Sequence, residues 1–163
     1  MGPISYEEKK IFPIHAGEIP IAIAGGAGNG TLVKQGFRLI EKIFLDFTQR
    51  RWKGKSPSFE EFEKAVQEIE SSLISRFKYL RNEGLEIDFE MVIGSVSPEG
   101  KASLYLFDDM GLANPVHDNP GFVILGRGFF TGGNLLLRLL DYNPEESGNL
   151  DLGVLSAFLI DVM

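Results

Sequence analysis

The chain has 163 residues, no cysteine and a formal net charge of −7, and 44% of its residues are hydrophobic. This length suits a single domain, residues 1–163, with a buried core, and the absence of cysteine excludes a disulfide framework and thiol chemistry. The negative charge argues against a general nucleic-acid or anionic-membrane surface. His15 and His117 stand far apart without metal-ligand spacing, so neither a metal nor a cofactor is predicted. No long apolar run and no signal peptide is found, so a cytoplasmic location is expected.

Residues 10–44 predict a hairpin, a glycine-rich corner and a helix. The apolar runs of residues 10–14 and 19–24 suit two strands joined by a short polar turn. Apolar side chains then recur at spacings of three and four, which predicts a helix over residues 30–48 with one buried face. Between the second strand and this helix lie four glycines within six residues: Gly25, Gly26, Gly28 and Gly30.

Two interpretations of the glycine-rich corner follow from the residues alone. A phosphate loop would bind an anion through backbone N–H groups, but Thr31 directly follows Gly30 and the lysine of G-x-x-x-x-G-K-[ST] is missing. The dinucleotide fingerprint G-x-G-x-x-G also fails, because its last glycine comes one residue early. A tight strand-to-helix corner, in which glycine permits unusual dihedrals and close packing, is favoured over both forms of nucleotide binding.

A basic loop and a second helix are predicted next. Residues 49–57 carry four positive charges and one tryptophan, a pattern that fits either a nucleic-acid contact or a solvated linker. The net negative charge of the chain favours the linker. Ser58 and Glu61 form a capping box, which predicts a helix over residues 58–83 that Gly84 ends.

From Ile87 the hydrophobic period drops to two, which predicts strands. Residues 87–107 form a second hairpin around a polar turn. The neighbouring Asp108 and Asp109 are expected in a turn, because adjacent strand residues point to opposite faces and cannot act as an acid–base pair. The remaining predicted elements are a strand at residues 121–125 and helices at residues 131–140 and 149–163.

Both halves of the chain resemble the proteasome β subunits. The first half contains KKIFPI, then IAIAG and a helix; the second contains MVIGSVSPEGKASLYLFDDMGL followed by FVILGRGFFTGGNLLLRLL. Order, spacing and element types agree across essentially the whole chain. The resemblance implies an α+β fold, the four-layer αββα sandwich of the N-terminal nucleophile (Ntn) hydrolases, without its first two strands and its last strands. The two hairpins are expected in two stacked sheets, with the two long helices paired on one outer face.

The resemblance also implies part of a catalytic group. Lys10 stands where the family has its catalytic lysine, and Gly25 where a backbone N–H forms the oxyanion hole. Arg127 replaces the serine of the family's Gly-Ser-Gly. Family members begin with a nucleophile, usually threonine, on a strand that would precede Lys9; eight residues precede Lys9 here, too few for two strands and a turn at about 3.3 Å per residue.

Three functions remain as alternatives. The first is a proteasome-like Ntn-fold protein without a complete active site, either a structural or assembly subunit or a truncated peptidase. The second is an active threonine-type peptidase or amidohydrolase whose nucleophile lies upstream. The third is a small nucleotide-binding protein using residues 25–31. We expect a homo-oligomer, because a sandwich without its first strands leaves open strand edges; a peptide is the candidate substrate, and no nucleic-acid or membrane partner is expected.

Overall fold

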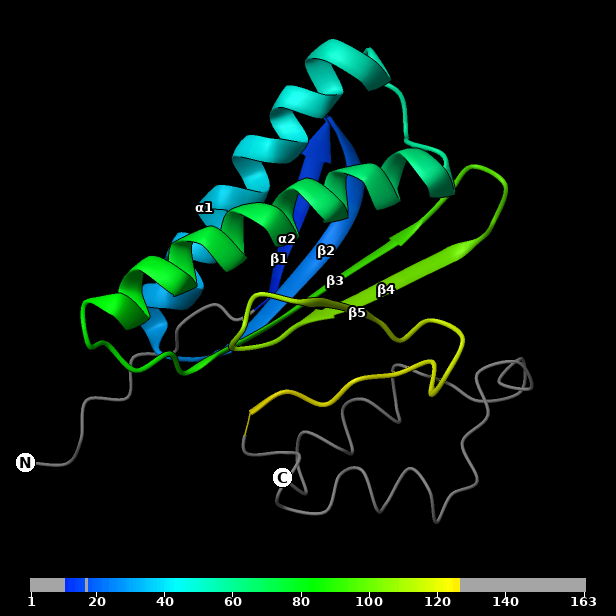
Figure 1. Cartoon of the computed structure of the whole chain (residues 1–163). Helices are drawn as coiled ribbons and strands as arrows, with labels where there is room; N and C mark the ends of the chain where they lie inside the picture. Colours follow the sequence, from blue (N-terminus) through cyan, green and yellow to red (C-terminus); the bar gives the residue numbers. More distant parts are fainter. Residues whose placement is uncertain (1–10, 17, 127–163) are drawn as a thin grey trace, which may run out of the picture.

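Five antiparallel strands form one sheet in the order β1-β2-β3-β4-β5 within residues 11–16 and 18–126, the part of the chain that the computed structural model describes. Two long helices cover one face of this sheet (Figure 1). The expected α+β class is confirmed. The elements in chain order are β1 (Ile11–Ala16), β2 (Ile19–Gly28), α1 (Gly30–Phe47), the π-helical turn η1 (Thr48–Trp52), α2 (Phe59–Asn82), β3 (Phe89–Val96), β4 (Ala102–Phe107) and β5 (Ala113–Pro115).

The two predicted hairpins lie in the same sheet, so the expectation that they occupy two stacked sheets is wrong for the described residues. Strand β2 pairs with β3, with Ile23 opposite Gly94 and Gly28 opposite Phe89. The reason is the path of the chain between them. It leaves β2 at Gly28, runs out along α1 and back along α2, and enters β3 at the direct partner of Gly28. The helical hairpin therefore returns the chain to the strand edge from which it departed.

Both long helices are confirmed to within about a residue at each end. The Oγ of Ser58 accepts a hydrogen bond from the backbone N–H of Glu61 at 3.3 Å, as an N-cap should. Helix α2 ends at Asn82, Gly84 follows its C-cap with a φ of +79°, and the N–H of Leu85 donates to the carbonyl of Leu80 at 3.0 Å. That bond is the mark of a Schellman motif. No helix within the described residues has the length and apolar character to cross a membrane.

The core lies between the helix pair and the sheet. Alternate residues of β3 (Phe89, Met91 and Ile93) point toward the helices and are buried. Their neighbours Glu90 and Val92 face the other way and are half-buried. The buried stripe of α2 meets this surface at Phe62, Ala65, Val66, Ile69, Leu73, Phe77 and Leu80. The apolar side chains, which repeat about every 3.6 residues in the helices and every second residue in the strands, therefore form the two surfaces that pack together.

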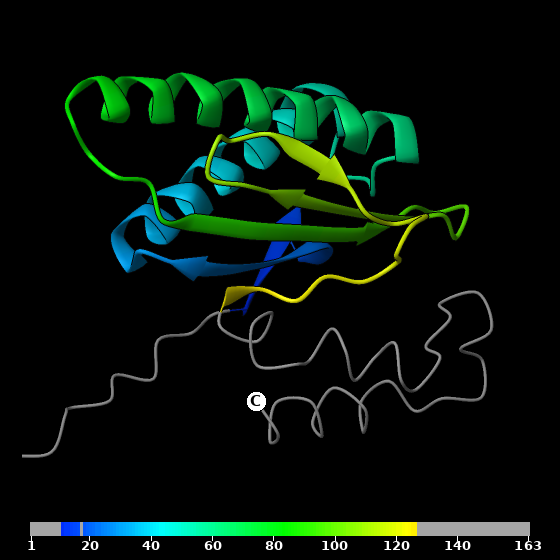
Figure 2. The same ribbon diagram turned by 60° about the horizontal axis from the view of Figure 1, so that its bottom comes forward.

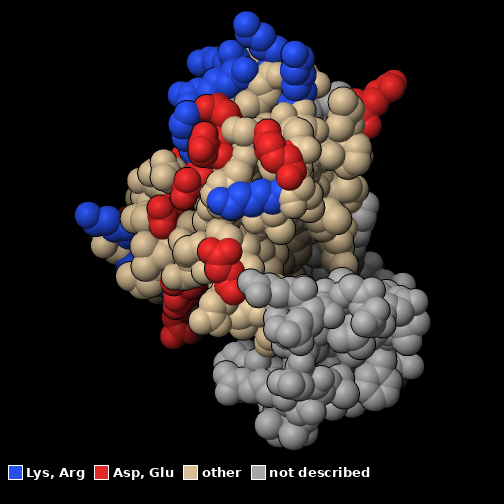
Figure 3. Space-filling model, turned by 90° about the vertical axis from the view of Figure 1, so that its right-hand side faces the viewer, with Lys and Arg blue, Asp and Glu red and all other residues tan. Residues whose placement is uncertain are grey.

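The basic loop is partly helical. Residues 48–52 continue α1 as a π-helical turn, and Trp52 is buried with its ring centroid 5.6 Å from Phe44 and 5.5 Å from Phe47. The expectation of a solvated linker over residues 49–57 is therefore wrong at its start, because the tryptophan ring gains burial in the core. A buried ring cannot stack on a nucleic-acid base. The exposed cations of this segment gather at one end of the molecule (Figure 3): Arg50, Arg51, Lys53 and Lys55.

The chain after β4 differs most from expectation. The Oδ1 of Asp108 accepts from the N–H groups of Met110 and Leu112, which confirms the turn. The strand predicted at residues 121–125 is wrong: the third strand of this half is β5, and residues 121–125 carry no strand pairing. Residues 116–126 instead cross toward the face of the sheet opposite the helices (Figure 2). The helices predicted at residues 131–140 and 149–163 lie outside the described residues.

Candidate functional site

The glycine-rich corner between β2 and α1 is closely packed. A Cβ on Gly26 would lie 2.6 Å from Cγ1 of Val33, and a Cβ on Gly28 would lie 2.4 Å from the carbonyl oxygen of Asp88. Gly28 also has a φ of +101°, a conformation that side chains strongly disfavour. Packing and backbone geometry thus account for both glycines without a ligand, which supports the strand-to-helix corner predicted from the sequence.

Asn29 caps the first turn of α1. Its Oδ1 accepts from the N–H of Thr31 at 3.0 Å and from the N–H of Leu32 at 3.2 Å, while its own N–H donates to the carbonyl of Asp88 at 2.7 Å. The side chain therefore occupies the donors that a phosphate loop would present. Strands β2 and β3, which precede and follow the two helices in the chain, are antiparallel, whereas the two strands of a nucleotide-binding βαβ unit are parallel. Sequence reasoning missed this cap, although an asparagine just before an apolar period is its usual signal.

Of the three residues predicted for a catalytic group, the structure describes Gly25. It is buried in the middle of β2, opposite Ile11 of β1 and Val92 of β3. Its backbone groups therefore lie in the plane of the sheet between two strands. Lys10 and Arg127 lie outside the described residues, so their convergence with Gly25 stays a prediction.

Glu90 is a charged residue near the C-terminal end of β2 that sequence reasoning did not consider as part of a site. It is half-buried opposite Ala27, and its Oε2 accepts a hydrogen bond from the N–H of Gly126 at 2.7 Å. Gly126 itself lies against β2, because a Cβ on it would be 3.1 Å from Cβ of Ala27. The available signal was the alternation of residues 87–93, which places Glu90 on the face away from the helices.

The face of the sheet opposite α1 and α2, here called the distal face, is mostly apolar. Ile11, Ile23 and Val96 are 62%, 58% and 66% exposed there. The half-buried apolar residues of this face are Val92, Leu104 and Leu106. Among the strand residues of the distal face, Glu90 is the charged one, and its carboxylate is bound to Gly126. An exposed apolar sheet face of this kind marks an interaction surface.

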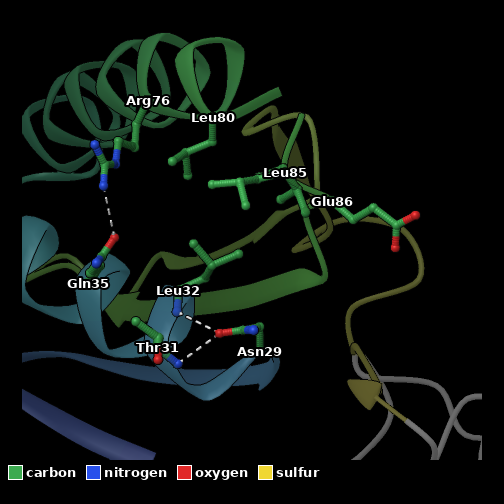
Figure 4. Close-up of a pocket in the computed structure, with 9 residues that line it drawn as sticks. Asn29, Thr31, Leu32, Gln35, Arg76, Leu80, Leu85 and Glu86 are labelled. Atoms are coloured by element: carbon green, nitrogen blue, oxygen red, sulfur yellow. Dashed lines mark hydrogen bonds between the residues drawn. The ribbon is translucent and has the colours of Figure 1, made fainter. Parts of the chain in front are cut away.

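A groove of about 310 Å³ lies on the helix side, between the start of α1 and the end of α2 (Figure 4). Leu32, Leu80, Leu85 and Ile87 line it with apolar side chains. At one end, the guanidinium of Arg76 points toward Gln35, whose Oε1 lies 3.5 Å from Nη2. The groove therefore combines an apolar wall with a cation at its rim.

Within residues 11–16 and 18–126, no group of three or more His, Asp or Glu side chains is arranged to hold a metal ion. No family model matches the sequence, and no curated protein matches it either. The resemblance to proteasome β subunits therefore stays a prediction.

Proposed function

We propose that this chain is a structural subunit of a proteasome-like assembly in the cytoplasm, related in fold to the Ntn hydrolases, and that it associates with further copies through its distal face. The observation that carries the proposal is the exposed apolar surface of Ile11, Ile23 and Val96 on that face. The described part of one copy consists of one helix layer and one sheet layer. Two copies packed sheet to sheet would therefore give the layer order αββα.

Electrostatics favours a second copy of the chain as the partner that covers the distal face. The whole chain carries a net charge of −7, so most surfaces of two copies repel each other. The strand residues of the distal face contribute Glu90 as their charged side chain, and it is held by Gly126. Contact through this face removes apolar surface from water at a small electrostatic cost, and an isologous contact uses the same patch on both partners.

Sedimentation velocity of the full chain over a wide dilution series tests this proposal. We expect a dimer or a larger oligomer, and the variant Ile23→Asp should dissociate at higher protein concentration than the parent. Leu45→Asp is the matched control, because Leu45 is an exposed apolar residue on α1, on the helix side. A monodisperse monomer at all dilutions, or equal effects of both variants, would contradict association through the distal face.

A peptidase assay separates the structural role from the threonine-peptidase alternative. The chain is incubated with fluorogenic peptides, with and without a covalent threonine-directed inhibitor. A structural subunit gives no turnover that the inhibitor blocks. Inhibitor-sensitive cleavage would instead favour an active threonine-type peptidase.

A further inference from the structure

We propose that the groove between α1 and α2 binds a small amphiphilic carboxylate, with its apolar tail against the leucines and its carboxylate on Arg76. This site lies on the helix side of the sheet, away from the distal face (Figures 1 and 4). It therefore goes beyond the proposed function and does not depend on it.

The apolar wall is held in place by backbone structure. Leu85 is the last residue of the Schellman motif, in which its N–H donates to the carbonyl of Leu80. Its side chain remains exposed. Leu32 sits in the first turn of α1, which Asn29 caps. These side chains are thus presented by ordered elements on both sides of the groove, so the surface is preformed and an apolar tail can bind without ordering a loop.

The charge of the groove favours an anion. Arg50 and Arg81 each pair with an aspartate, whereas Arg76 forms no ion pair with any described residue; its contacts are Gln35 and, at 5.9 Å, the Tyr79 ring. The start of α1 at the opposite wall adds the positive end of a helix dipole. Glu86 also borders the groove, but its carboxylate points away from it (Figure 4).

The size of the groove favours a small ligand. A volume of about 310 Å³ is at the lower end of the range for small-molecule sites, which suits a short tail with one polar head. A nucleotide is a poorer fit, because Asn29 already occupies the first-turn N–H groups that would bind its phosphates. The apolar wall and the cation of Arg76 therefore point to a carboxylate with a short apolar tail.

Octanoate is the probe, titrated into the full chain and followed by calorimetry and by amide chemical shifts in nuclear magnetic resonance. We expect saturable binding with shifts confined to residues 29–35, 76–80 and 85–87. Octanamide has the same tail without the charge and should bind about tenfold more weakly, the loss expected for one charge-assisted hydrogen bond. This comparison uses the unaltered protein, so it holds even where a variant fails to fold.

The variant Arg76→Gln should weaken octanoate binding by about tenfold as well. Arg38→Gln removes the same charge from an exposed position on α1 outside the groove lining and should bind octanoate as the parent does. Equal affinity for octanoate and octanamide, equal effects of the two variants, or shifts on the distal face would overturn the proposal. Saturable binding of ATP in place of octanoate would overturn it too, and would favour the nucleotide-binding alternative.

Discussion

Glu90 and Gly126 are joined by a hydrogen bond of 2.7 Å, from the backbone N–H of Gly126 to the Oε2 of Glu90. This bond fastens the end of the segment 116–126 to β3 on the distal face. The start of the same segment is fastened separately, because the N–H of Val116 donates to the carbonyl of Leu104 at 2.9 Å. The hydrogen bond at the Gly126 end of the segment thus depends on the side chain of Glu90.

Replacing Glu90 by alanine should release the end of this segment. The N–H of Gly126 loses a charged acceptor, which costs about 1 to 2 kcal/mol, and its hydrogen exchange should accelerate accordingly. The N–H of Gly121 donates to the carbonyl of Val116 and should keep its protection. Glu90→Gln retains an acceptor oxygen and should give a smaller effect. Equal acceleration at Gly121 and Gly126 would mean that Glu90 acts on the whole segment.

Gly26 and Gly94 allow a matched test of the packing at the glycine-rich corner. Both lie in paired strands, but Gly26 faces the helices and Gly94 faces away. Gly26→Ala forces a Cβ to within 2.6 Å of Val33, so we expect a loss of about 1 to 3 kcal/mol from overpacking. Gly94→Ala meets the flexible end of Leu104 at 3.3 Å and should change stability by less than about 1 kcal/mol. Urea denaturation measures both, and a tolerated Gly26→Ala would remove the packing explanation for that glycine.

Asn29 offers a test of the cap that closes the corner. Asn29→Ala leaves two first-turn N–H groups without their acceptor and should cost about 1 kcal/mol in urea denaturation. Asn29→Asp keeps an acceptor and adds a charge that the helix dipole favours, so it should be at least as stable as the parent. Equal losses in both variants would show that the amide of Asn29 contributes through contacts other than the cap.

The elements that the sequence predicted well are those with local signals. Ser58, Gly84 and the two hydrophobic periods sufficed for both long helices and for the hairpin of β3 and β4. The pairing of β2 with β3 was not predictable in this way, because it depends on how far α1 and α2 run before the chain returns. The weak pattern at residues 121–125 misled for a related reason: that segment is tied by Glu90, a contact 36 residues away in sequence.

The candidate sites were less accessible to sequence reasoning than the fold. The glycines drew attention to phosphate binding, while Asn29 between them supplies the acceptor that closes the helix end. Trp52 among basic residues suggested a surface contact, but its ring packs inward on Phe44 and Phe47. The groove at Arg76 brings together residues from three separate segments, and no local pattern marks such a surface. The roles of the glycines, of Trp52 and of Arg76 thus depend on tertiary contacts.

The buried Tyr105 should make the free energy of unfolding depend on pH in the alkaline range. Its ring is 5% exposed under α2, 6.4 Å from the Phe62 ring, and burial, followed by the negative charges of Glu63 and Asp118, raises its pKa above the ordinary value of 10.0. The folded state then holds the phenolic proton more tightly than the unfolded state, so this stabilisation is complete below pH 10 and falls as pH rises through the folded-state pKa. Tyr105→Phe cannot ionise, and its free energy of unfolding should therefore fall less between about pH 8 and pH 11 than that of the parent. Tyr79→Phe is the matched control, because it removes the same hydroxyl from an exposed ring. Urea denaturation across this pH range measures all three proteins, and parallel slopes for the parent and Tyr105→Phe would contradict the role of Tyr105.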